Sequence, residues 1–259
     1  MTSPLFITNM HHEQLAAVLE GEQLPKKALV IICHGFGAHK NLPWKQALSA
    51  TLLQRKLPSL RFDFSGCGES QGLFEESTYT KQLSDLFSVI NWSFEHGYHQ
   101  LYLAGHSRAG SVVLRAASER HGICGVIDIA GVAYVEQFDR RLTAAQAREL
   151  QLTGKTAIPL PIRLDGKLFT LTKEFIDDTK TWHLFQTVKH IKCPLLIIHG
   201  EKDQSVPLQD SKDLYWEAMC EKVMDVLPGC DHYFRSEQEQ QLLAITITRW
   251  VMKHENATF

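Results

Sequence analysis

Short apolar segments alternate with longer amphipathic segments along most of this chain. The short segments are rich in Val, Ile and Leu, and several are apolar on both faces, which is typical of strands covered on each side. We predict six such strands, at residues 28–34, 59–64, 101–105, 125–131, 194–200 and 223–228.

The longer segments repeat apolar residues at helical spacing. We predict helices at residues 42–56, 77–96, 109–122, 208–222 and 236–254, the last with Ser236 as its N-cap. The repeated strand–helix order predicts an α/β protein with a mostly parallel central sheet and helices on both faces. Residues 5–20 instead show two partly alternating runs around a polar middle. We interpret these runs as an N-terminal antiparallel hairpin at the sheet edge.

The alternation stops between residues 132 and 190. This segment contains no convincing strand, but it carries polar helix-like pieces and several aromatic side chains. A segment of this length between two strands of one sheet is usually an insertion with structure of its own, and it often covers a site. We therefore predict a single domain over residues 1–259, with residues 132–190 inserted in it as a small cap or lid.

Composition and charge narrow the function classes. The chain has 259 residues, 44% hydrophobic and 22% charged, and a net charge of −2, so nothing global favours nucleic acid or an anionic membrane. No apolar stretch approaches the ~20 residues that span a bilayer, and the start lacks a secretory signal pattern. The six cysteines lack paired spacing, which favours free thiols in a reducing compartment. We predict a cytoplasmic protein without a metal site, and the sequence does not distinguish a monomer from a homodimer.

One strand end carries a candidate nucleophile. Ser107 lies in the sequence GHSRAG, between the end of a predicted strand and the start of a predicted helix. A turn this sharp strains the backbone at its apex and requires small residues two positions before and after it. Gly105 and Ala109 meet this requirement, with alanine in place of the last glycine of the G-x-S-x-G pattern. A tight turn alone would also explain the small residues, but it would not explain a serine at the apex.

Two further residues complete a candidate catalytic triad. A serine hydroxyl needs a base to remove its proton, and the base needs an acid to orient it. For a nucleophile on such a turn, the expected chain order is serine, acid, histidine. Asp203 follows the fifth predicted strand and His232 follows the sixth, so both lie at the same sheet edge as Ser107. We predict these three as catalytic residues, and Asp128, at another strand end, is the alternative acid.

Two backbone amides are candidates for an oxyanion hole. Acyl transfer passes through a tetrahedral oxyanion that positioned N–H groups stabilise, and losing one donor typically costs ~10²–10³ in rate. We assign one donor to the N–H of Arg108, which follows the nucleophile. The second is the N–H of Phe36 in the loop HGFGAHKN, where glycines let the backbone approach the substrate closely.

Several neighbouring residues have structural interpretations. We predict that His106 points away from the hydroxyl of Ser107 and that His34 organises the loop that donates the second amide. The side chain of Arg108 is predicted to pair with a nearby carboxylate rather than to contact substrate. We interpret Asp231 as a turn residue rather than a second catalytic acid.

Five segments together resemble the α/β-hydrolase fold serine hydrolases. They are HGFG (34–37), RFDFSGCGES (61–70), GHSRAG (105–110), HGEKDQSVP (199–207) and DHYF (231–234). The second segment is similar to that of bacterial feruloyl/cinnamoyl esterases and their serine-aminopeptidase-like (S33-type) relatives, where it shapes a loop near the site. The resemblance implies an α/β-hydrolase fold for nearly the whole chain outside the insertion.

These observations predict a serine hydrolase that cleaves small carboxylic esters through an acyl-enzyme intermediate. The chemistry requires no metal or organic cofactor, and the only predicted partner is a small-molecule ester with an aromatic or medium apolar acyl group. The candidate pocket residues are Phe36, Phe74, Tyr134, Phe138, Trp182 and Tyr233. The same triad would serve a thioesterase or an amidase of the aminopeptidase kind, and a non-catalytic ligand-binding protein is the alternative from another class.

Overall fold

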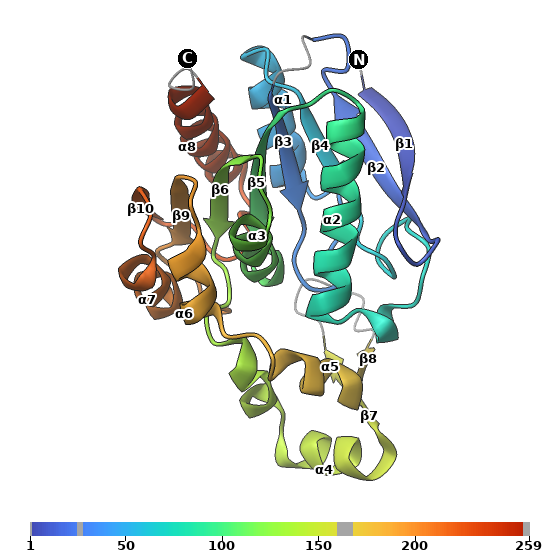
Figure 1. The fold of residues 1–259 in the computed structure, drawn as a ribbon. Helices are drawn as coiled ribbons and strands as arrows, with labels where there is room; N and C mark the ends of the chain where they lie inside the picture. The colour runs from blue at the N-terminus through green and yellow to red at the C-terminus, as the bar shows by residue number, and fades with distance from the viewer. Residues whose placement is uncertain (1, 25–27, 160–167, 256–259) are drawn as a thin grey trace.

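The computed structural model is built around one eight-stranded sheet (Figure 1), and it describes residues 2–24, 28–159 and 168–255. The sheet contains β1 (Thr2–Thr8), β2 (Gln14–Glu20), β3 (Ala28–Cys33), β4 (Ser59–Phe62), β5 (Gln100–His106), β6 (Ile123–Ile129), β9 (Leu195–Gly200) and β10 (Lys222–Leu227). Their spatial order is β1-β2-β4-β3-β5-β6-β9-β10. The pairs from β4 to β10 are parallel, whereas β1 and β2 form an antiparallel hairpin on the β4 edge. The predicted parallel sheet and the N-terminal hairpin are both confirmed, and the strand ends differ from the predicted ones by no more than about two residues.

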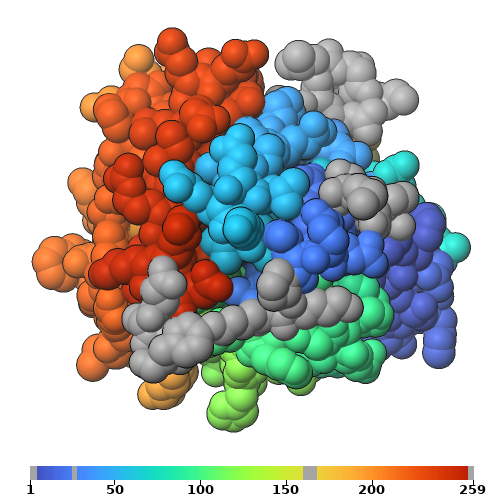
Figure 2. Space-filling view, turned by 90° about the horizontal axis from the view of Figure 1, so that it is seen from above, coloured from blue at the N-terminus to red at the C-terminus, as the bar shows by residue number. Residues whose placement is uncertain are grey.

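Helices cover both faces of the sheet. One face packs against α1 (Pro43–Gln54) and α8 (Glu237–Glu255), and the other packs against α2 (Tyr79–Glu95), α3 (Arg108–Glu119) and α7 (Leu208–Glu217). Successive residues of β3 alternate between these two cores, as the two-residue period of a strand requires. Seen from the end opposite the insertion, α8 (red) and α1 (light blue) lie side by side on the surface (Figure 2).

One predicted helix end is confirmed and another lies earlier than predicted. The final helix is capped as predicted, because the N–H of Glu239 donates to Oγ of Ser236 at 3.2 Å and the Glu239 carboxylate accepts from the Ser236 N–H. The helix predicted at 208–222 ends earlier, at Glu217, because the backbone turns extended at Ala218 and leads into β10. No helix among the described residues is long and apolar enough to cross a membrane.

Most of the described part of the insertion, residues 132–190, lies beyond the carboxyl ends of the parallel strands (Figure 1), whereas its last part, residues 184–190, packs against α3 and α7. It contains the 3-10 helix η2 (Val135–Arg141), α4 (Ala144–Thr153), β7 (Lys155–Pro159), β8 (Leu168–Thr172), α5 (Lys173–Thr179), α6 (Leu184–Thr187) and the 3-10 helix η3 (Val188–His190). The expectation that this segment lacks strands was wrong, because β7 and β8 pair antiparallel as a two-stranded ribbon. Each strand has only five residues, and β7 includes a proline, so the alternating pattern is too short to recognise without its partner.

Candidate active site

Ser107 lies at the apex of the turn between β5 and α3. Its backbone has φ 55° and ψ −121°, a region that non-glycine residues rarely occupy and that stores strain. Its N–H donates to the carbonyl of Ile129 at the end of the neighbouring strand, at 2.8 Å, which fixes the apex. The strained conformation lifts the side chain away from both the strand and the helix.

Small residues around Ser107 permit this turn. A Cβ added at Gly105 would lie 2.2 Å from the carbonyl oxygen of Ala109, so strand and helix approach too closely for any side chain there. A Cβ at Gly35 would lie 3.1 Å from the Cβ of Ser107, which explains the glycine in the facing loop. Ala109 is fully buried, and the methyl group that replaces the last glycine of the pattern is accommodated.

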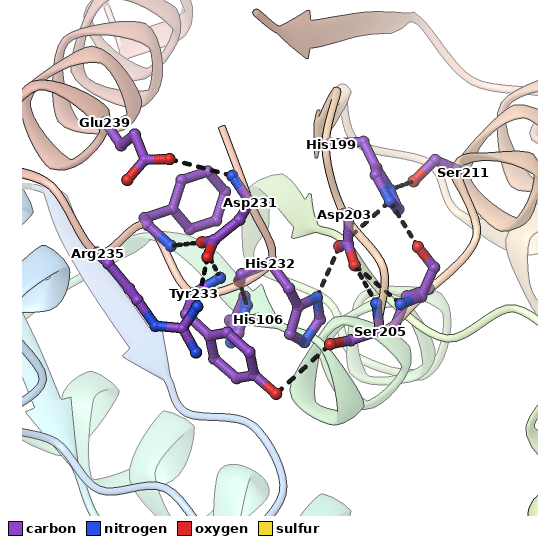
Figure 3. A network of polar contacts seen from close by, with 12 residues as sticks. His106, His199, Asp203, Ser205, Ser211, Asp231, His232, Tyr233, Arg235 and Glu239 are labelled. Carbon is purple, nitrogen blue, oxygen red and sulfur yellow. Dashed lines mark hydrogen bonds and ion pairs between the residues drawn. The ribbon is translucent and has the colours of Figure 1, made fainter. Parts of the chain in front are cut away.

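Asp203 and His232 meet at the same sheet edge (Figure 3). Asp203 follows β9 and His232 follows β10, and Nδ1 of His232 lies 2.7 Å from Oδ2 of Asp203. The other carboxylate oxygen accepts the N–H groups of Ser205 and Val206 at 2.8 and 2.9 Å. Burial would raise the pKa of Asp203, but the hydrogen bonds from the two histidines and the loop outweigh it and hold that pKa far below its usual value.

An ionised Asp203 sets the proton positions on His232. A carboxylate only accepts hydrogen bonds, so Nδ1 of His232 carries the hydrogen and Nε2 keeps a free lone pair. Ser107 and His232 line the same cavity. The three residues of the predicted triad are therefore brought to one site.

His199 is a second histidine on Asp203, and the sequence interpretation missed it. Its Nε2 lies 3.3 Å from Oδ2 of Asp203 and 3.0 Å from the carbonyl of Val206, while Nδ1 lies 2.8 Å from Oγ of Ser211. Burial lowers the pKa of His199, but the hydrogen bond to Asp203 outweighs it and raises that pKa overall. His199 thus holds the carboxylate of Asp203 in place, and the four-residue spacing in HGEKD was the available signal.

Phe36 and Arg108, whose N–H groups are the two predicted oxyanion donors, line the same cavity as Ser107 and His232. Among the described residues, neither the N–H of Phe36 nor that of Arg108 donates to another protein group, so both are free for a ligand. His34 organises the loop as predicted, because its Nδ1 donates to the carbonyl of Gly35 at 2.9 Å and its Nε2 accepts the N–H of Phe64 at 3.0 Å. Burial lowers the pKa of His34 to about 3, so the ring stays neutral and keeps both bonds.

The prediction that the Arg108 side chain pairs with a carboxylate was wrong. The guanidinium donates to the carbonyl of Ser77 at 2.6 Å and lies over the rings of Phe36, Tyr79 and Phe175 at 5.2, 4.6 and 5.0 Å. Burial lowers the pKa of Arg108 to about 10, so it remains charged at neutral pH. An aromatic cage takes the place of a counter-ion, since ring faces attract cations, and only the folded chain brings these rings together.

His106 and Asp231 have the structural roles that were predicted for them. Nε2 of His106 donates to the carbonyl of His232 at 2.8 Å, and burial lowers the pKa of His106 well below its usual value. Asp231 accepts the N–H groups of Tyr233 and Phe234 at 2.8 and 2.9 Å. Both residues therefore hold the backbone around His232, one of the three candidate catalytic residues (Figure 3).

A cavity of about 530 Å³ opens beside Ser107 and is mainly apolar. Phe36, Phe138 and Tyr233 line it, as predicted. The insertion forms a large part of its wall. Lining residues that the sequence interpretation missed include Tyr79, Arg141, Leu142, Gln146, Ile158 and Gln204.

Three predicted pocket residues do not line the cavity. Trp182 is fully buried, with its Nε1 donating to Oγ1 of Thr80 at 3.3 Å. The hydroxyl of Tyr134 donates to Asp213 at 2.8 Å, which turns the ring away from the site. Phe74 packs edge-on behind Phe36, with ring centroids 5.2 Å apart, and supports the wall without facing the cavity. Aromatic composition alone did not reveal which side of the insertion each ring would face.

Asp128, the alternative acid, is fully buried. Its carboxylate packs against two glycines, since a Cβ at Gly110 or Gly131 would lie 2.2 or 2.0 Å from Oδ1. Within the described part of the chain, neither carboxylate oxygen has a hydrogen-bond partner of ordinary geometry. Burial raises the pKa of Asp128 to about 7. The structure therefore favours Asp203 as the acid.

The raised pKa of Asp128 predicts a pH-dependent stability difference between wild type and Asp128→Asn. Between about pH 8 and pH 5 the folded protein takes up a proton that the unfolded chain does not, because an unfolded aspartate titrates near 4. Folding of the wild type is thus favoured as pH falls. Denaturant unfolding should find the asparagine variant more stable than wild type at the higher pH, with the advantage lost at the lower pH. A difference that is equal at both pH values would contradict the assignment.

A profile of the alpha/beta hydrolase family matches residues 30–245, and the chain belongs to this family. Among curated proteins it is similar to the human palmitoyl-protein thioesterase ABHD10, mitochondrial, with 29% identity over 192 residues. The match covers 73% of this chain and 61% of that protein, so the chain spans about three fifths of that relative's length. It is also similar to a monoacylglycerol lipase of Mycolicibacterium smegmatis, with 24% identity over 258 residues, covering 88% of this chain and 89% of the lipase.

Solved structures show the same fold. Est1E from Butyrivibrio proteoclasticus, with ferulic acid bound, superimposes with a TM-score of 0.84 at 25% identity and covers 96% of this chain and 98% of its own. Mouse alpha/beta hydrolase domain-containing protein 10 superimposes with a TM-score of 0.82 at 24% identity, covering 97% and 99%. The predicted α/β-hydrolase fold is confirmed.

Proposed function

We propose that this protein is a serine hydrolase that cleaves small carboxylic esters through an acyl-enzyme intermediate. The observation that carries the proposal is the 2.7 Å contact between the buried carboxylate of Asp203 and His232, which lines the same cavity as Ser107. A strained serine, an oriented base and two unused amides at one apolar cavity are the parts that acyl transfer requires.

In the acylation step, Nε2 of His232 removes the proton of the Ser107 hydroxyl as Oγ attacks the ester carbonyl. The negative charge that develops on the carbonyl oxygen is stabilised by the N–H groups of Phe36 and Arg108. Asp203 keeps the imidazole oriented and stabilises its positive charge. When the tetrahedral intermediate collapses, His232 gives the proton to the leaving oxygen, and the alcohol departs.

Deacylation repeats the same chemistry with water. His232 removes a proton from a water molecule that attacks the acyl carbonyl, and the same two amides stabilise the second oxyanion. The carboxylic acid leaves as His232 returns the proton to Oγ of Ser107. The base and the oxyanion donors are used in both half-reactions, so no cofactor enters the cycle.

The comparisons support ester-like substrates and favour thioesters as the second candidate. Est1E carries ferulic acid, an aromatic carboxylic acid, and the cavity here is lined by the aromatic rings of Phe36, Phe138 and Tyr233. The name of human ABHD10 describes a thioesterase, which forms the same acyl-enzyme from a sulfur leaving group. An ester and a thioester differ here only in the atom that His232 protonates.

Trapping the acyl-enzyme tests the proposal. The purified protein is mixed with p-nitrophenyl butyrate and with the matching butyryl thioester, quenched in acid, and analysed by mass spectrometry. We expect a butyryl adduct on the peptide that contains Ser107, with a burst of p-nitrophenol. A butyryl group found only on cysteine, or no turnover of any ester or thioester in a panel of acyl lengths, would refute the proposed function.

A further inference from the structure

Among the described residues, those that line the cavity beside Ser107 include cationic side chains. Among the described residues that line it, none is an aspartate or glutamate, while Arg108 and Arg141 both contribute to its wall. Arg108 is buried and enclosed by aromatic rings, with its guanidinium bonded to Ser77. Arg141, at the end of η2 in the insertion, is exposed. The positive charge available to a ligand in this cavity therefore comes from Arg141.

Arg141 has no ion pair within the described part of the chain, although acidic residues lie near it. Asp139 pairs with Lys180 at 2.6 Å, and Asp210 accepts the N–H of Ala133 at 2.9 Å. The charge of Arg141 acts to lower the pKa of the Asp210 carboxyl group. Asp210 is nevertheless buried and is not among the residues that line the cavity. A guanidinium without a carboxylate partner at a cavity wall is suited to bind one from a ligand.

An apolar path connects the oxyanion loop to this guanidinium. The ring of Phe36, whose N–H is an oxyanion donor, lies 6.3 Å from the ring of Phe138, centroid to centroid. Cζ of Arg141 lies 5.9 Å from the ring centroid of Phe138. An ester held at Ser107 can thus extend along two aromatic rings and present its far end to Arg141.

The backbone that carries Arg141 is tied to the rest of the insertion. Thr143, two residues after Arg141, caps α4 in a capping box, in which its side chain accepts the N–H of Gln146 and the Gln146 side chain accepts the N–H of Thr143. Nε2 of Gln146 also donates to the carbonyl of Ala157 in β7 at 3.0 Å. Thr143 and Gln146 line the cavity as well, so polar groups accompany the guanidinium at this end of the wall.

We propose that Arg141 forms an anion subsite, so that the preferred substrates are esters with a carboxylate at the end remote from the scissile bond. This inference rests on the proposed function and names its substrate class. The aromatic path selects an apolar or aromatic spacer between the ester and the carboxylate. The acyl part or the leaving group can carry the carboxylate, and the two cases are separated by experiment.

The experiment compares each anionic ester with its own methyl ester, which has the same length and no charge. The acyl pair type, made with two chain lengths, places the carboxylate on the acyl part, as in the mono-p-nitrophenyl esters of adipate and of suberate. The other pair places it on the leaving group, as 4-(butyryloxy)phenylacetate. The proteins are wild type, Arg141→Gln, Arg141→Glu and the control Arg140→Gln. Arg140 is the adjacent arginine, which bonds Gln137 at 2.7 Å and does not line the cavity.

We expect the anionic-to-neutral ratio of kcat/KM to fall about fivefold in Arg141→Gln, because a partly exposed ion pair has that order of effect. Reversal of the charge in Arg141→Glu should lower the ratio about 20-fold, since attraction becomes repulsion. Arg140→Gln should keep the wild-type ratio. Added salt should lower the ratio of the wild type and leave that of Arg141→Gln unchanged, because salt screens exposed charges. If the ratio changes in the Arg141 variants for the acyl carboxylates, the acyl part reaches Arg141. If it changes for the leaving-group carboxylate, the leaving group does.

Failure of this inference differs from failure of the proposed function. If the wild type hydrolyses the neutral esters but the ratio is the same in all four proteins for both pairs, the anion subsite is refuted while the esterase stands. If no ester is turned over, the proposed function fails, and the subsite is then judged by calorimetry of monomethyl suberate and dimethyl suberate binding. In that case, equal affinities for the two compounds, or affinities unaffected by Arg141→Gln, would refute it.

Discussion

Replacing Ser107 with alanine should abolish ester hydrolysis, with kcat falling by about 10⁶-fold. The alanine keeps the backbone turn but removes the only atom that can form the acyl-enzyme in the proposed mechanism. Residual catalysis would come from the two oxyanion amides and from binding alone. Steady-state kinetics with a p-nitrophenyl ester measure this loss, and a fluorophosphonate probe should label the wild type and not the variant.

The fold should survive this replacement, because the strained φ of 55° at Ser107 is held by the strand and helix on either side. Thermal unfolding should therefore show similar midpoints for wild type and Ser107→Ala. Ser118→Ala is a matched control on the same helix, since its hydroxyl donates to the carbonyl of Arg115 at 2.8 Å and lies far along α3 from the site. Substantial turnover by Ser107→Ala, comparable with that of Ser118→Ala, would remove Ser107 as the nucleophile.

Asp203→Asn should lower kcat by about 10⁴-fold while leaving the protein folded. The asparagine oxygen can keep the backbone N–H groups of Ser205 and Val206, but its amide group then faces Nδ1 of His232 as a donor. That arrangement favours the histidine tautomer with hydrogen on Nε2, which cannot accept the serine proton. Kinetics at several pH values, with circular dichroism to verify folding, would measure the effect.

Asp128→Asn distinguishes the two candidate acids. Because the Asp128 carboxylate is fully buried against glycine backbone and has no bond to His232, its asparagine variant should keep kcat within about tenfold of wild type. The opposite pattern, with Asp203→Asn active and Asp128→Asn inactive, would transfer the role of the acid to the end of β6.

The pattern of residues along the chain was sufficient to predict those features that depend on residues close together in the sequence. Strand positions followed from apolar runs, and the turn around Ser107 followed from the small residues at Gly105 and Ala109. The order of serine, acid and histidine along the chain could be read because each candidate directly follows a predicted strand. Parallel strands end at one sheet edge, so sequence position after a strand already implies spatial proximity.

Features that depend on distant partners could not be read in the same way. The cage around Arg108 joins Phe36, Tyr79 and Phe175, which come from three separate segments. The inward or outward direction of the insertion's aromatic rings depends on packing against other elements, which is why Trp182 was misplaced. The β7–β8 ribbon was missed because each strand is stabilised mainly by the other.

By itself, the sequence determined the α/β architecture, the strained serine turn and the identity of the three candidate catalytic residues, because these are set by short-range periodicity and sterics. Only the tertiary structure decided that His199 contacts Asp203, that an aromatic cage replaces a counter-ion for Arg108, and that Arg141 reaches the cavity without an ion pair to any other described residue. Those outcomes depend on which side chains meet across the fold, and contact and burial, rather than residue type, fix their charge states and partners.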